Sequence, residues 1–88
     1  MKIKDGFILR DLAGKTLVVA VGKRSKEFKG MITLNETGKV IWKVLEIGAT
    51  KDEIVDKLLK EFEGATRQEV EDDVTAFISN LERDNILE

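Results

Sequence analysis

The sequence has 88 residues, 36% of them charged and 42% hydrophobic, with a net charge of −2 at pH 7. A chain of this length supports one small core, so we treat residues 1–88 as a single domain. Neither Cys nor His is present, which excludes disulfides, thiolate nucleophiles, zinc-finger patterns and the commonest general base. The slight acidic excess is unfavourable for a dedicated nucleic-acid binder.

The N-terminal residues open no apolar stretch typical of a signal peptide, and no segment approaches the length of a membrane span. We therefore expect a cytoplasmic protein without a membrane partner.

Residues 7–34 are predicted to form three strands. Runs rich in β-branched or aromatic residues occupy 7–12 and 16–21, and the short gap between them contains Gly14, which indicates a hairpin. A third, short strand is predicted over 31–34. Such a meander puts the second strand in the middle and the third at an edge, where unpaired backbone groups can receive an extended peptide.

From Asn35 onward the apolar residues follow a helical period. Asn35 is a good N-cap, and Thr50 and Thr66 each open a capping-box pattern that ends in Glu three residues later. Asn85 is expected to stop the last helix. The helices are predicted over about 35–48, 50–64 and 66–85, and their apolar faces comprise Val40, Ile41, Val44, Leu45; Ile54, Val55, Leu58, Leu59, Phe62; and Val70, Val74, Phe77, Ile78, Leu81. The predicted fold class is α+β, with a helix-turn-helix relation between the last two helices.

Two charged clusters each have more than one interpretation. The basic patch, Lys23, Arg24, Lys26 and Lys29, lies where a DNA-binding wing would be. It fits contact with phosphate or with acidic residues of a peptide, and equally the protection of an exposed strand edge from aggregation.

The acidic cluster comprises Glu69, Glu71, Asp72 and Asp73. Its first residues fall at a helix start, where negative charge is stabilised by the helix dipole. We interpret the cluster as a solvated helix start, and we expect no catalytic residues, no metal site and no cofactor.

Two aromatic residues stand out. Trp42 lies beside the apolar face of the first predicted helix and is expected in the core. Phe28, inside a run of charges, is predicted either to tuck under the sheet or to offer an anchor for a partner.

In the order of its motifs, the sequence resembles the PqqD-like family. These proteins are the relatives of pyrroloquinoline quinone biosynthesis protein D and are also called RiPP recognition elements. The motifs are Leu34-Asn35-Glu36-Thr37-Gly38, Ile41-Trp42, Leu45, Thr50, Glu53-Ile54, Leu58, Phe62, Val70, Asp73-Val74, Phe77-Ile78, Leu81 and Ile86-Leu87. The resemblance covers about residues 5 to 88. Where many relatives end in Gly-Leu-Leu, this chain has Asn85, which tolerates the same left-handed conformation.

The resemblance implies a winged helix-turn-helix with a three-stranded N-terminal sheet. It also implies a non-catalytic module that binds the leader of a ribosomally synthesised precursor peptide and presents it to a radical SAM enzyme, a cyclase or a leader peptidase. The leader would add as a strand beside the third strand and against the last helix. The expected peptide-binding residues are Lys29, Met31, Ile32, Thr33, Leu34, Glu69, Asp73, Phe77 and Asn80.

Two alternatives stay open from the residues alone. A winged-helix DNA-binding regulator would use the last helix as its reader, but that helix starts with one Arg among the acids of the acidic cluster, and this charge would repel phosphate. A homodimer through the exposed strand edge is also possible, because an edge that accepts a peptide can accept a second copy.

Overall fold

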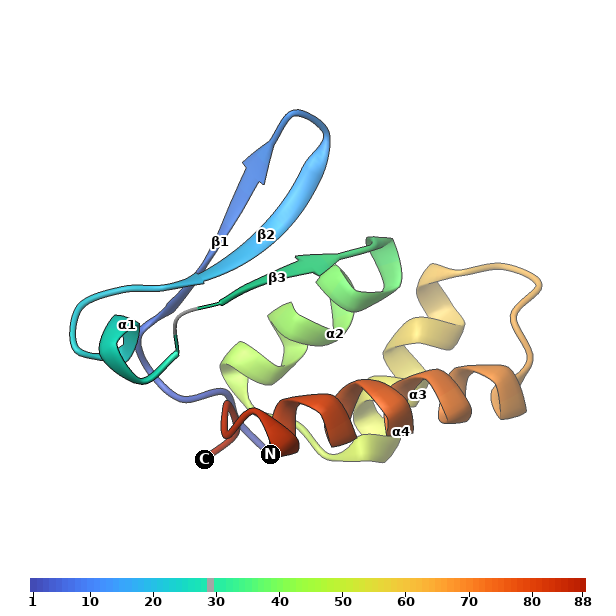
Figure 1. Ribbon diagram of the computed structural model, residues 1–88. Coiled ribbons are helices and arrows are strands. Elements are labelled where there is room, and N and C mark those ends of the chain that lie inside the picture. Colours follow the sequence, from blue (N-terminus) through green and yellow to red (C-terminus); the bar gives the residue numbers. More distant parts are fainter. Residues whose placement is uncertain (29) are drawn as a thin grey trace.

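In the computed structural model, which describes residues 1–28 and 30–88, a three-stranded antiparallel sheet precedes a layer of helices (Figure 1). The elements are β1 (Phe7–Leu12), β2 (Lys15–Ala20), α1 (Arg24–Glu27), β3 (Met31–Leu34), α2 (Glu36–Ile47), α3 (Lys51–Glu61) and α4 (Arg67–Arg83). The strand order is β1-β2-β3, so β2 is central and β3 lies at an edge, as predicted. The α+β fold class is confirmed, and α3 and α4 pack together across a short turn.

The hairpin between β1 and β2 turns through Ala13 and Gly14, whose φ angles of 53° and 78° are both positive. A two-residue turn of this kind matches the twist of the flanking strands. Lys15 pairs with Leu12, so β2 begins one residue earlier than predicted and also ends one residue earlier. The hairpin extends away from the helices (Figure 1).

The prediction of three helices was incomplete, because the described chain contains a fourth, the single-turn α1 inside the basic patch. The Ser25 hydroxyl donates to the Gly22 carbonyl, and Arg24 forms an ion pair with Glu27 at 2.6 Å. Both contacts join residues three apart. A helix of four residues has no periodic apolar face, so the sequence pattern did not predict it. A helical turn therefore follows β2 in the segment where the wing was expected.

Three polar side chains cap the longer helices as expected. Asn35 accepts a bond from the Gly38 amide, and Thr50 and Glu53 form both bonds of a capping box. At Thr66 only half of the predicted box is present in the described residues: its hydroxyl accepts from the Glu69 amide, while the Glu69 side chain stays exposed. There its charge still faces the positive end of the helix dipole.

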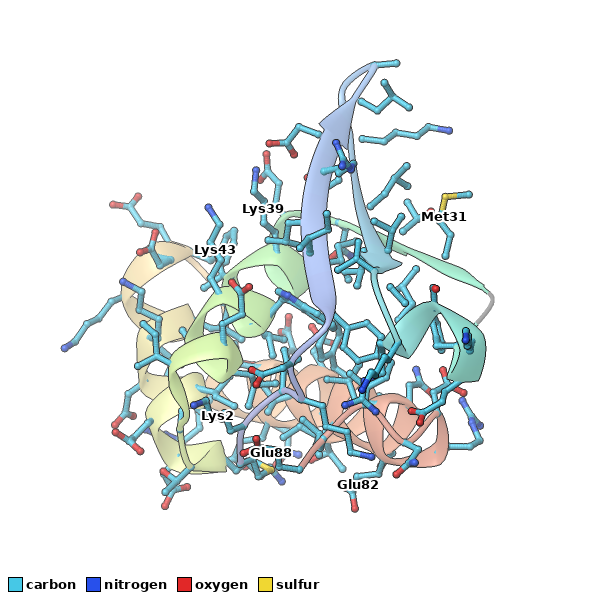
Figure 2. The ribbon with its side chains drawn as sticks, turned by 90° about the vertical axis from the view of Figure 1, so that its left-hand side faces the viewer. Lys2, Met31, Lys39, Lys43, Glu82 and Glu88 are labelled. Atoms are coloured by element: carbon cyan, nitrogen blue, oxygen red, sulfur yellow. The ribbon has the colours of Figure 1, made fainter. Side chains whose placement is uncertain are left out.

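In the part of the chain that the structure describes, the helices cover one face of the sheet (Figure 1). Strand side chains alternate between the two faces, so every second one points toward the helices. Phe7, Val18 and Leu34 face the helices and are buried. The side chain of Met31 lies on the opposite face of the sheet, next to that of Val19, its partner in the β2–β3 register. Figure 2 shows Met31 on one side of the hairpin and Lys39 of α2 on the other.

Trp42 connects the helices to the sheet. Its side chain is fully buried, and its ring meets Phe7 of β1 edge-on with centroids 6.0 Å apart. Phe28 approaches Phe7 in the same manner at 5.6 Å. Trp42 is thus a core residue, as predicted, and Phe28 takes the first of its two predicted places, packed against the core.

Both ends of the chain lie together beneath the sheet. Asn85 adopts a φ of 59°, which lets Ile86 return to full burial, as expected. Ile3 pairs with Leu87 and is also buried, with its amide donating to the Leu45 carbonyl. No periodic pattern in the sequence marks this N-terminal segment as part of the core.

Trp42→Ala is expected to lower the free energy of unfolding by roughly 3–5 kcal/mol, because it removes the largest fully buried side chain and leaves a cavity. Urea denaturation followed by circular dichroism measures the change. Ile47→Ala is the control on the same helix, since Ile47 is 84% exposed, and its effect should stay within about 0.5 kcal/mol. Equal losses in both variants would contradict this description of the core.

Candidate functional site

The first part of the candidate site is the free edge of β3. Among the described residues, this strand pairs only with β2. The tight turn closes on a hydrogen-bonded pair, Leu12 and Lys15, and bonded and non-bonded pairs alternate from there. The alternation directs the amides of Ile32 and Leu34 toward β2, and the amides and carbonyls of Met31 and Thr33 toward the open side.

That open side faces α4. In both views the last helix runs beneath β3, on the side away from β2 (Figures 1 and 2). Leu34 is buried at the end of the strand, Ile32 is half-buried, and Met31 and Thr33 are exposed. The strand therefore offers unpaired backbone groups between an apolar inner row and an exposed outer row.

The second part is a hollow of about 270 Å³ between the first turns of α2 and the middle of α4. The hollow adjoins the end of β3, because Asn35, the residue after that strand, is part of its lining. It is lined by Asn35, Thr37, Gly38, Ile41, Asp73, Ala76, Phe77 and Asn80. Ile41 is buried, Phe77 is half-buried, and Asp73 and Asn80 are exposed. The hollow thus combines an apolar floor with a polar rim.

Gly38 sets how closely α2 and α4 approach at this hollow. It is buried in the first turn of α2, and a Cβ built there would lie 3.2 Å from the Phe77 ring and 3.4 Å from the Leu34 side chain. Those distances are shorter than ordinary carbon contacts. The missing side chain lets the Phe77 ring sit against both α2 and the end of β3.

The structure brings together only some of the predicted site residues. Asp73, Phe77 and Asn80 share the hollow, at a spacing that puts them on one face of α4. Glu69 lies one turn earlier on that helix and does not line the hollow. Lys29 lies outside the described residues.

The α2 side of the hollow was not among the predicted site residues. Asn35 and Gly38 were interpreted as a helix start, and they serve as one while also lining the hollow. A signal was present in Gly38, because Gly inside a helix costs about 1 kcal/mol relative to Ala and so indicates a close approach.

The start of α4 is acidic, and its one basic residue is neutralised. Arg67 donates to Asp56 of α3 at 2.9 Å and to Glu71 at 3.5 Å. The hydrogen bond that the Arg67 guanidinium donates to Asp56 is the main cause that raises the pKa of Arg67. Arg67 therefore joins the two helices and does not offer a free cation.

No group of His, Cys, Asp or Glu side chains within residues 1–28 and 30–88 is arranged to hold a metal ion. Over the same residues, no helix is long and apolar enough to cross a membrane.

Comparison with known proteins places this chain in a family. The sequence model described as coenzyme PQQ synthesis protein D (PqqD) matches residues 14–87. The chain belongs to this family, which confirms the resemblance noted in its sequence. A search of curated proteins found no match.

Two solved structures are similar to this chain. One is described as TbiB1 in complex with the TbiA(beta) leader peptide; it has a TM-score of 0.77 and 27% identity, over 100% of this chain and 95% of that one. The other is described as lasso peptide synthetase B1 complexed with the leader peptide; it has a TM-score of 0.72 and 18% identity, over 97% of this chain and 93% of that one. The second likeness bears on the fold alone.

Gly38→Ala is expected to push the Phe77 ring into the hollow, because that side is open while Leu34 is buried. The better helix propensity of Ala offsets the crowding, so the free energy of unfolding should change by less than about 1 kcal/mol. Two-dimensional NMR should show the aromatic resonances of Phe77 shifted. A loss above about 2 kcal/mol with unmoved Phe77 resonances would show that the ring cannot yield.

Proposed function

We propose that this chain is a non-catalytic module that binds the leader of a ribosomally synthesised precursor peptide and presents it to a modifying enzyme. The observation that carries the proposal is the free edge of β3, which lies beside the hollow of α2 and α4. Membership of the PqqD family supports it, as does the likeness to TbiB1, whose structure is described as a complex with a leader peptide.

The geometry suits strand addition. A peptide paired with β3 lies about 4.8 Å from it. Its backbone would form hydrogen bonds with the unpaired amides and carbonyls of Met31 and Thr33. Its side chains then alternate between the hollow and the outer face of the sheet. The inner ones meet Phe77, and Asp73 and Asn80 are within reach of polar groups. Glu69, one turn away, is proposed to contact the peptide beyond the hollow.

The proposed role ends at binding. The chain contains neither His nor Cys, so the commonest general base and a thiolate nucleophile must come from another protein. The partner is proposed to be a radical SAM enzyme, a cyclase or a leader peptidase, working in the cytoplasm where the precursor is made.

Recognition of DNA is not favoured. A reader helix needs free cations near its start, and here Arg67 is paired with Asp56 and Glu71 among further acids. Pairing of two copies along β3 stays a prediction; it would compete with the leader for the same backbone groups.

Thr33→Pro tests the edge. The Thr33 amide faces the open side, so proline removes a donor for the leader without removing a bond to β2. Affinity for a fluorescent peptide with the cognate leader sequence, measured by anisotropy, should fall by about tenfold or more, with little change in thermal unfolding. Thr33→Val is the matched control, because it keeps the amide and should bind within about twofold.

Ile32→Pro provides the complementary result. The Ile32 amide faces β2, so this substitution should destabilise the fold itself. Unchanged leader affinity in Thr33→Pro would remove β3 from the binding site.

Asp73→Ala and Asn80→Ala test the wall formed by α4. Both residues are exposed, so the melting temperature should change little, while leader affinity should fall several-fold to hundredfold, about 1–3 kcal/mol. Isothermal titration calorimetry with the same peptide measures both variants. Asp52→Ala, at an exposed position of α3, is the control. Full affinity in both α4 variants would leave the strand edge as the whole site.

A further inference from the structure

The outer face of the sheet carries apolar side chains that no described helix covers. The register aligns Ile8, Val19 and Met31 in one row across the three strands, with Leu17 and Leu12 toward the hairpin turn. Leu12 and Met31 are 64% and 63% exposed. We call these five residues, with Arg10, Lys15 and Thr33 of the same face, the outer face.

The outer face is separate from the core. Leu9, Ala20 and Ile32, on the inner face, pack against the buried cluster, whereas Ile8, Leu17 and Val19 have no place in that packing. All three side chains are half-buried. Contiguous apolar side chains left in water are uncommon on a monomeric protein and mark interaction surfaces.

The charges of the outer face have one sign. Arg10 and Lys15 are its only charged residues, in a chain with 17 acidic and 15 basic residues. The nearest acid in sequence, Asp11, points to the inner face, where it accepts a bond from Thr16 at 2.7 Å and pairs with Lys39 at 3.3 Å. Neither cation of the outer face has an ion-pair partner among the described residues.

We propose that the outer face docks the enzyme that modifies the leader-bound precursor, through an apolar patch of that enzyme bordered by carboxylates. This inference rests on the proposed function. The charges argue against a second copy as the occupant, because two outer faces brought together would oppose four cations with no carboxylate between them.

The outer face is continuous with the proposed peptide strand. Met31 and Thr33 belong to both, since their backbone groups form the free edge and their side chains point outward. A leader strand added there extends the face by one strand, and every second leader side chain stands beside Met31 or Thr33. The enzyme therefore contacts sheet and leader together, and it binds the loaded module more tightly than the empty one.

The test reverses the two cations with Arg10→Glu and Lys15→Glu together. Both residues are exposed, so the fold tolerates the change. The matched control is Lys51→Glu with Lys60→Glu on α3, which alters the net charge equally and lies in the helical layer. Leu12→Ser tests the apolar part at an exposed position. The reaction contains the precursor and the enzyme that modifies it, and mass spectrometry follows the mass of the precursor.

The Arg10/Lys15 variant should bind the leader within about twofold of the unaltered chain while supporting modification at least tenfold more slowly. The control should match the unaltered chain in both measurements, and Leu12→Ser should bind leader normally and slow modification. Modification at the full rate by the Arg10/Lys15 variant would overturn the proposal. A dimer of the unaltered chain in sedimentation that the variant dissociates would overturn it too, in favour of a second copy.

Leader binding is measured without the enzyme, so the two proposals fail separately. If the unaltered chain binds no leader, the proposed function fails and this inference falls with it. If leader binding is intact and charge reversal is harmless, only the outer face loses its role.

Discussion

The burial of one indole holds this fold together. Trp42 is the residue at which α2, the first strand and the segment after α1 meet, through Phe7 and then Phe28. Its N–H has no hydrogen-bond partner within the described chain, and leaving such a donor unpaired costs about 1–3 kcal/mol. Burial of the whole ring and its edge-on contact with Phe7 offset this cost.

A core of this size covers only one side of a sheet. The helices bury the inner row of each strand, and little apolar surface is left over for a second layer. An open edge and an exposed sheet face are the consequences, and each is a liability for aggregation unless something binds it. Under the proposed function the molecule is one half of an assembly, and a leader peptide paired with β3 would complete the sheet.

Features set by a few neighbouring residues were predictable from the sequence, and features set by distant contacts were not. The turn at Gly14, the caps at Asn35 and Thr50, and the left-handed Asn85 each follow from local conformational preferences. The N-terminal segment has no such pattern, because Ile3 is held by backbone bonds to Leu45 and the chain end. For the site, the family resemblance named four residues of α4, of which Asp73, Phe77 and Asn80 line one hollow and Glu69 does not. The α2 wall was missed, because Gly38 inside a helix indicates a close approach but does not identify the partner, which is Phe77 of α4.

The pairing of Ile3 with Leu87 has a topological consequence. The Lys2 carbonyl accepts from the Glu88 amide at 2.8 Å, so the two ends of the chain lie a strand's width apart. They emerge beside the last turn of α4, at the far end from the hairpin turn (Figure 1). A linker of a few residues would close the chain into a ring, and new ends could then be opened at the exposed turn without cutting the core. For the same reason, the domain suits insertion into a surface loop of a larger protein, where it would enter and leave through one point.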